Sequence, residues 1–299
     1  MPNSNGPTMI GIGAQKCASS WVHAALGIHP QICVSDPKEL DFFSYYFDRG
    51  YEWYEGHFNQ TAGRPVKFEA SPSYLHDPRC PTRVHAYNPA MKILLMLRDP
   101  IDRAYSNHLH EVIKGHIGPI SFADGLANNP SYIEQGLYAT HLARWLAVFP
   151  RDQVLVVFAE EVAANPEAAA AAVYAFAGVD STFTSQVLRE RRNESDKARL
   201  PVLRQGLRAG GRLLRRFGLE ERLASLKKSG PVARMMSANS VDLRQTIPPM
   251  DPDSRAYLRT VFAPEIAALR GLLGRDILPW KSRGRYGDSD TTTISKAIE

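Results

Sequence analysis

The chain has 299 residues, of which 44% are hydrophobic and 22% are charged, values that are ordinary for a soluble globular protein. The net charge of +5 suits an anionic ligand but is too small to indicate nucleic-acid binding. Because no apolar stretch approaches the roughly 20 residues that cross a bilayer, a transmembrane helix is excluded. The length allows one large α/β domain or two small ones.

The three cysteines are Cys17, Cys33 and Cys80. Their odd number and wide spacing fit neither a disulfide framework nor a zinc site. The first residues, MPNSNGPT, lack the basic region and apolar run of a signal peptide. These features predict a reducing compartment and a cytoplasmic location.

The stretch from Thr8 to Trp21 carries the strongest local pattern. It predicts a short buried strand, Met9–Gly13, then a small-residue turn and a helix that opens near Ala18 and Ser19. The start of a helix offers backbone N–H groups and the positive end of the helix dipole, which together bind anions. Lys16 adds a charge, and Ser19 and Ser20 add hydroxyl donors.

This turn departs from the pattern G-x-x-x-x-G-K-[ST] of nucleoside triphosphatases. No glycine precedes Lys16, and Cys17 stands where the metal-binding hydroxyl would be. We therefore expect an anion site that works without a metal ion. The alternative is an ordinary buried strand, turn and helix with a surface lysine.

A second polar segment follows the short strand predicted at Ile32–Val34. It contains Asp36, Lys38 and Glu39 before the pair Phe42–Phe43. A carboxylate beside apolar rings can have a raised pKa and act as a general base. The alternative is a charged turn closed by two buried rings.

The order of strands and helices predicts an α/β fold, with a P-loop-like, mainly parallel sheet between two layers of helices. Further strands are expected at Val66–Ala70, Met91–Leu97 and Gln153–Ala159. Helices are expected from about Tyr51, and at Pro81–Tyr87, Gln135–Phe149, Glu161–Ala177 and Asp251–Leu273, the last capped by Asp251 or Asp253.

A second anion site is predicted after the strand Met91–Leu97. Arg98 stands at its carboxyl end, Asp99 and Pro100 are typical of a helix start, and Ser106 lies about two turns into that helix. A guanidinium binds phosphate oxygens in a fork. The alternative is an Arg–Asp surface pair, and Arg103 is expected to be structural.

His108 and His110 follow on the same helix and face different sides. A polar surface histidine is the commoner interpretation of each, and His110 is the better catalytic candidate of the two.

Residues Arg189–Arg234 are rich in arginine and lysine, with leucines interleaved. This basic amphipathic segment leaves three alternatives open: a lid over an anionic ligand, a membrane-surface helix, or a solvated face. We predict one domain over residues 1–283, with a basic helical insertion or lid at about 197–236, and a polar tail at 284–299.

Taken together, these motifs resemble the sulfotransferases that use 3′-phosphoadenosine-5′-phosphosulfate (PAPS), and most closely the heparan sulfate branch with its soluble bacterial relatives. The resemblance covers nearly the whole chain in collinear order. Its motifs include IGIGAQKCASS (10–20), KELDFF (38–43), EASPSYL (69–75) and LRDPIDRAYS (97–106). Further along the chain come LYATHLARW (137–145), NES (193–195) and the helix with PMDPD (249–253). The motifs at 10–20 and 97–106 are the most specific.

The resemblance implies a role for each motif. Lys16, Ser19, Ser20 and the backbone amides of the turn would hold the 5′-phosphosulfate, and Arg98 and Ser106 the 3′-phosphate. Glu39 would be the general base, with His110 or His108 as the alternative. The donor-binding residues predicted in this way are Gln15, Lys16, Cys17, Ala18, Ser19, Ser20, Trp21, Arg98, Ser106 and Arg244. The predicted co-substrate is PAPS, its product is PAP, and no metal is expected.

This chain also departs from the heparan branch, which carries a lysine where Ala70 stands and a glycine where Ala18 stands. The resemblance implies in-line transfer to a hydroxyl, or less readily an amine, of a glycan, glycolipid or small molecule. The aromatic residues of Tyr45–Tyr54 and the basic segment are candidates to line the acceptor site. Two alternatives remain, a P-loop-like kinase and a non-catalytic module that binds nucleotides or polyanions. The oligomeric state is not predicted.

Overall fold

A computed structural model describes residues 6–58, 63–189, 197–198, 240–241 and 247–280. The chain divides into two compact units, Met1–Asn107 with Phe122–Arg192 and Met250–Glu299, and His108–Ser121 with Asn193–Pro249. The single domain predicted for 1–283 stays a prediction, because the two units are described separately.

The first unit is built on a five-stranded sheet in the order β2-β3-β1-β4-β5, and every neighbouring pair is parallel. The strands are β1 (Met9–Gly13), β2 (Ile32–Val34), β3 (Val66–Ala70), β4 (Lys92–Leu97) and β5 (Val154–Phe158). All five were predicted from the apolar runs in the sequence. The predicted α/β class is therefore confirmed.

The order of the strands places a topological switch point at the carboxyl ends of β1 and β4. The connection after β1 leads to β2 on one side of the sheet, whereas the connection after β4 leads to β5 on the other side. Such a switch point is where open α/β sheets bind their ligands. β1 is buried along its whole length, and β4 is buried from Ile93 onward.

The helices of this unit and the connecting 3₁₀ turns occupy most of the remaining described residues. The α-helices are α1 (Ser19–Gly27), α2 (Gly50–Gly56), α3 (Cys80–Tyr87), α4 (Pro100–Lys114), α5 (Phe122–Asn128), α6 (Ser131–Glu134), α7 (Tyr138–Leu146), α8 (Ala159–Ala164), α9 (Pro166–Ala177) and α13 (Pro252–Leu273). The 3₁₀ turns are η1 (Phe47–Arg49), η2 (Pro72–Tyr74), η3 (Arg151–Gln153) and η4 (Gln186–Arg189).

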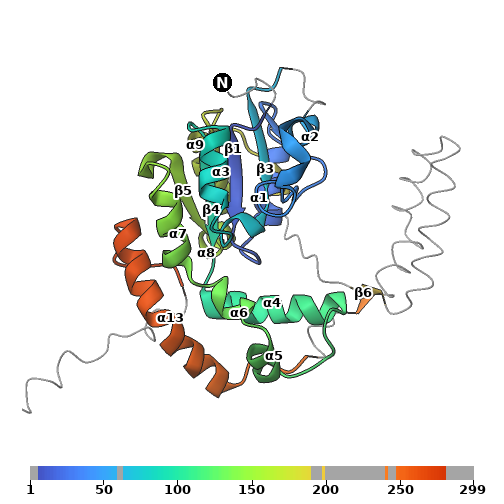
Figure 1. Cartoon of the computed structure of the whole chain (residues 1–299), viewed down its shortest axis with the longest axis vertical. Coiled ribbons are helices and arrows are strands. Elements are labelled where there is room, and N and C mark those ends of the chain that lie inside the picture. The colour runs from blue at the N-terminus through green and yellow to red at the C-terminus, as the bar shows by residue number, and fades with distance from the viewer. Residues whose placement is uncertain (1–5, 59–62, 190–196, 199–239, 242–246, 281–299) are drawn as a thin grey trace, which may run out of the picture. The chain divides into compact units, whose positions relative to one another are not determined.

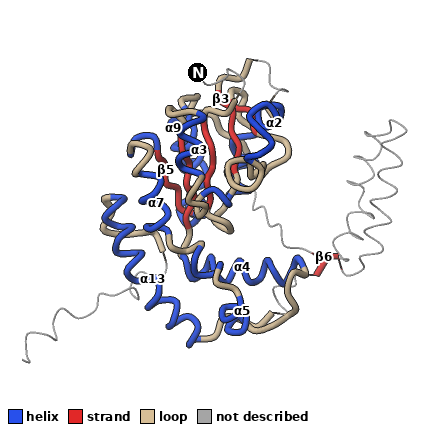
Figure 2. The backbone as a smooth tube through the Cα atoms, in the orientation of Figure 1, coloured by secondary structure: helices blue, strands red, loops and turns tan. Residues whose placement is uncertain are grey.

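Helices cover both faces of the sheet. Helix α1 packs on β2 and β3 and also on α9, which packs on β5, so α1 and α9 share one layer. Figure 1 shows α3 in front of the strands on the other face, and Figure 2 shows the strands enclosed between helices. This is the three-layer arrangement that the sequence predicts.

Two predicted helices are shorter than expected. The helix predicted at Glu161–Ala177 is divided into α8 and α9, because Pro166 lacks an N–H and disfavours helical geometry at Asn165. Asn165 instead caps α9 by accepting a hydrogen bond from the N–H of Ala168 at 3.0 Å. The helix predicted at Gln135–Phe149 begins only at Tyr138, after Gly136 has passed against the ring of Phe262.

The predicted helix ends are confirmed at three places. Asp99 accepts a hydrogen bond from the N–H of Ile101 at 2.9 Å and so caps α4. Asp251 caps α13 through the N–H of Ser254 at 2.7 Å. Gly178 ends α9 in the left-handed conformation, with φ 83°.

The described part of the second unit contains a short antiparallel pair, β6 (Lys197–Ala198) with β7 (Ser240–Val241). It also contains the end of α4 from His108 onward. Most of the predicted basic segment, the proposed lid at 197–236 apart from β6, and the polar tail lie outside the described residues.

The sheet requires a small residue where β1 and β3 approach closely. Gly11 is in register with Ala70, and a Cβ atom at Gly11 would lie 2.9 Å from the Cβ of Ala70. We expect Gly11→Ala to lower the free energy of unfolding by about 1–3 kcal/mol, since neither strand can move freely. Urea unfolding measures this change.

Gly271→Ala in α13 is the matched control, because a Cβ there meets no atom within 4 Å. Alanine is the better helix former, so this variant should be as stable as the wild type or more stable. Equal stability of Gly11→Ala and the wild type would contradict the close packing of β1 on β3.

Candidate functional site

The loop after β1 has an unusual backbone. Ala14 donates its N–H to the carbonyl of Met96, at the end of β4, at 2.7 Å. Lys16 and Ala18 then adopt left-handed conformations, with φ 68° and 69°. The carbonyl of Ala18 accepts hydrogen bonds from the N–H groups of Trp21 and Val22, which begins α1. The first turn of α1 therefore opens at the carboxyl edge of the sheet, as an anion site requires.

Two of the predicted donor-binding side chains are committed to the protein interior. The Cys17 thiol is buried and lies 3.6 Å from the carbonyl of Gln15 and 3.7 Å from the Tyr138 hydroxyl. The Trp21 indole donates to the carbonyl of Leu188 at 2.8 Å. Cys17 can therefore offer a ligand only its backbone amide, whereas Gln15, Lys16 and Trp21 are half-buried.

Lys38 joins the loop after β1 to the loop after β2. Its Nζ atom donates to the hydroxyl of Ser20 at 3.1 Å and, less closely, to that of Ser19 at 3.4 Å. The same Nζ lies 2.8 Å from Oε1 of Glu39. The three hydroxyl and carboxylate groups come from motifs far apart in the sequence, and one ammonium group holds them together.

Glu39 lies on the exposed rim of this cluster, with 45% of its side chain accessible to solvent. Its backbone is left-handed, with φ 64°, and so is that of Asp41, with φ 50°. Leu40, Phe42 and Phe43 on the same loop are buried in the core. The structure shows the charged turn closed by two buried rings, and the role of Glu39 as a general base stays a prediction.

The positive φ values gather in these two loops. Among the described residues, the non-glycine positions with positive φ are Lys16, Ala18, Glu39 and Asp41. Each such position costs on the order of 1–3 kcal/mol, and strain of this kind concentrates at functional sites. The backbone thus marks the same two loops that the side chains bring together.

The buried carboxylate of Glu69 supports the loop that follows β2. Glu69 is fully buried in β3 and accepts hydrogen bonds from the hydroxyls of Ser71 at 2.9 Å and Tyr54 at 3.2 Å. The Ser71 hydroxyl in turn accepts the N–H of Asp41 at 2.9 Å, and Ser73 donates to the Asp41 carboxylate at 2.6 Å. Burial raises the pKa of Glu69 to about 7, although these hydroxyl donors oppose the shift.

Arg98 stands at the carboxyl end of β4, directly beside β1. It is half-buried, and its charge is one of the factors that lower the pKa of Cys17, which burial raises to about 11. Arg98 therefore lies at the same sheet edge as the loop after β1. Ser106 lies two turns into α4 and is half-buried.

Arg103 is structural, as expected. Its side chain is fully buried and donates to the carbonyl of Tyr132 and to the side chain of Gln135, the latter at 3.2 Å. It therefore holds α4 to the segment that contains α6.

His108, His110 and Arg244 stay predictions, as do the roles of the other predicted site residues. His108 is buried, so its interpretation as a surface histidine is wrong, and burial lowers its pKa. His110 is half-buried. Both belong to the second unit, so their distance from Glu39 is not defined. Arg244 lies outside the described residues.

Lys38 and Glu69 are the residues that sequence reasoning missed. Lys38 had a signal, since it precedes Glu39 in a loop at the same sheet edge as Ser19 and Ser20. A lone glutamate inside an apolar strand was the signal for Glu69.

Within the part of the chain that the structure describes, no helix is long and apolar enough to cross a membrane. The same residues contain no group of three or more histidine, cysteine, aspartate or glutamate side chains placed to hold a metal ion.

Comparison with known proteins gives consistent results. A family model described as "Sulfotransferase domain" matches residues 7–199. Human bifunctional heparan sulfate N-deacetylase/N-sulfotransferase 2 is 30% identical over 196 residues, which is 58% of this chain and 22% of that protein. Mouse heparan sulfate glucosamine 3-O-sulfotransferase 6 is 29% identical over 187 residues, which is 60% of this chain and 54% of that protein. The matches thus span only part of both relatives.

The crystal structure of a sulfotransferase from Alicyclobacillus acidocaldarius superposes with a TM-score of 0.67 at 26% identity. The superposition covers 91% of this chain and 97% of the other. The similarity therefore includes nearly the whole of both chains.

The buried Glu69 should make stability depend on pH. Its pKa is about 7 in the folded protein against an ordinary 4.5, so between these values the folded state binds more protons than the unfolded state. Stability should then fall by up to about 3 kcal/mol as pH rises from 4.5 to 7. Glu69→Gln removes this titration and should gain stability relative to the wild type between pH 5 and pH 8.

Urea unfolding of Glu69→Gln and the wild type at pH 5 and pH 8 measures this change in stability. Asp152→Asn, a change at an exposed carboxylate before β5, serves as the control and should keep the wild-type pH dependence. If Glu69→Gln has the same dependence as the wild type, Glu69 does not titrate in this range.

Proposed function

Because the chain belongs to the sulfotransferase domain family, we propose that it transfers a sulfuryl group from PAPS to a hydroxyl group of a carbohydrate-type acceptor. The relatives named above are sulfotransferases of heparan sulfate, which supports a sugar as acceptor. The observation that carries the proposal is the contact of Lys38 with Ser19, Ser20 and Glu39, since it joins an anion-binding loop to a carboxylate.

The residues at the sheet edge suit a ligand with two anionic groups. Lys16, Ser19 and Ser20, with the first amides of α1, are proposed to bind the 5′-phosphosulfate. Arg98, at the end of the neighbouring strand, and Ser106 are proposed to bind the 3′-phosphate. PAPS supplies the sulfuryl group when bound, and PAP is the product.

The chain's own residues carry the remaining steps. Glu39 accepts the proton of the acceptor hydroxyl while that oxygen forms its bond to sulfur and the bond from sulfur to the phosphate oxygen breaks. Lys16 offsets the negative charge that grows on the departing phosphate oxygen. Lys38 orients Glu39 and adds a second positive charge beside Ser20.

The predicted cytoplasmic location stays a prediction.

The first test separates binding from catalysis. Glu39→Gln should leave the affinity for PAP unchanged and lower the turnover of labelled PAPS by about 10²–10⁴, the contribution of a general base. Isothermal titration and transfer of the isotopic label measure the two quantities. Normal turnover by this variant would move the role of base to His110 or His108, and failure of the wild type to bind PAP would argue against the whole proposal.

A second test concerns Lys38. Lys38→Met removes charge-assisted hydrogen bonds of about 1.5–3 kcal/mol and should lower kcat/KM for PAPS about 10- to 100-fold. Lys92→Met is the matched control, because Lys92 begins β4 at the opposite edge of the sheet and lies over the ring of Phe176. Equal kinetics for Lys38→Met and the wild type would remove Lys38 from the site.

A further inference from the structure

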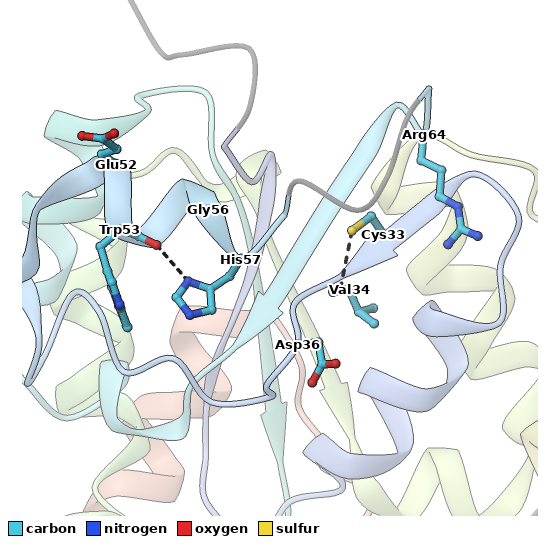
Figure 3. A pocket seen from close by; sticks show the side chains of 8 residues that line it. All are labelled: Cys33, Val34, Asp36, Glu52, Trp53, Gly56, His57 and Arg64. Carbon is cyan, nitrogen blue, oxygen red and sulfur yellow. Dashed lines mark hydrogen bonds between the residues drawn. The ribbon is translucent and has the colours of Figure 1, made fainter. Parts of the chain in front are cut away.

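A pocket opens beside the proposed catalytic loop, in the first unit. It has a volume of about 560 Å³, within the usual range of small-molecule sites. Its walls come from the end of β2, from α2 and from the chain before β3, with the lining residues Cys33, Val34, Asp36, Glu52, Trp53, Gly56, His57 and Arg64. Figure 3 shows Asp36 at one end and Glu52 and Arg64 toward the other.

The pocket begins close to Glu39. Asp36 precedes Glu39 by three residues, so their Cα atoms lie at most about 11 Å apart. An oligosaccharide with one hydroxyl at Glu39 could therefore place a neighbouring sugar unit at Asp36.

The polar groups of the pocket are mainly hydrogen-bond acceptors. Asp36 and Glu52 supply exposed carboxylates. Nδ1 of His57 lies 2.9 Å from the carbonyl of Trp53, and because a carbonyl can only accept, Nδ1 carries the proton. In the neutral ring Nε2 is then a third acceptor.

Positive charge in the pocket comes from Arg64, and part of it is already engaged. The guanidinium donates through Nη1 to the carbonyl of Ile32 at 2.8 Å. The lining thus contains two carboxylates and one guanidinium, which gives it a negative balance. Such a lining favours ligands with many O–H or N–H donors and repels anions.

Trp53 forms a fixed wall of the pocket. The guanidinium of Arg49 lies over the Trp53 ring at 4.7 Å from its centroid, and the ring of His57 meets it edge to face at 4.5 Å. Because these contacts hold the ring in place, Trp53 gives the pocket a fixed shape. The choice among ligands of similar shape then depends on the charges and hydrogen-bonding groups of the lining.

We propose that this pocket binds the sugar unit next to the hydroxyl that receives the sulfuryl group, and that it selects neutral or amine-bearing sugars over anionic ones. The proposal rests on the proposed function. It names the class of acceptor, which is a glycan that has not yet been sulfated along its length.

Three trisaccharides test the proposal: a chitosan trisaccharide with free amines, the neutral chitin trisaccharide, and a sulfated trisaccharide of similar size. We expect the wild type, titrated with each in the presence of PAP, to bind the first or second at least about 10-fold more tightly than the third. The double variant Asp36→Asn/Glu52→Gln should lose about 10-fold or more in affinity for the amine-bearing sugar.

Asp152→Asn is the matched control, since its exposed carboxylate precedes β5, the strand at the other side of the sheet from β2. Its three affinities should equal those of the wild type. Tightest binding of the sulfated sugar by the wild type, or unchanged affinities in the double variant, would overturn the proposal.

Titration with PAP alone distinguishes failure of the pocket assignment from failure of the proposed function. PAP binding combined with the wrong sugar preference refutes the pocket assignment and leaves the sulfotransferase function standing. Absence of PAP binding refutes the function, and the pocket assignment with it.

Discussion

The ammonium group of Lys38 is shared among the hydroxyls at the start of α1 and the carboxylate of Glu39. These groups follow β1 and β2, which are not neighbours, because β3 lies between them. Only a parallel sheet brings the carboxyl ends of all three strands to the same edge. The contact therefore depends on the topology of the whole sheet, and the proposed donor site and proposed base are positioned by the same charge.

The strained backbone of the two loops costs free energy, and contacts with the core compensate for it. Four non-glycine residues in the two loops have left-handed backbones, and a carboxylate lies buried beneath one of these loops. Glu69 orders Ser71, which receives the N–H of Asp41. The aromatic packing of Phe42 on Tyr54, with ring centroids 4.4 Å apart, fixes the other side of the same loop. A strained loop can persist when packing and buried hydrogen bonds both hold it.

Much of the fold follows from local patterns in the sequence. The apolar run at Met91–Leu97 predicted a buried strand, and the Asp99–Pro100 pair predicted the start of α4, because both signals act within a few residues. The division at Pro166 was overlooked, although proline chemistry predicts it. Lys38 and Glu69 could not be assigned from spacing alone. The serine partners of Lys38 lie 18 to 19 residues away, and Tyr54, a partner of Glu69, lies in helix α2. The pocket could not be predicted from the sequence for the same reason, because three separate segments form it.

The position of Cys17 has a consequence for redox behaviour. Its thiol is enclosed beneath the loop after β1, against the hydroxyl of Tyr138, and burial keeps it protonated at neutral pH. Oxidants and alkylating reagents attack the exposed thiolate form of cysteine. The buried cysteine in the proposed donor-binding loop is therefore shielded from such reagents.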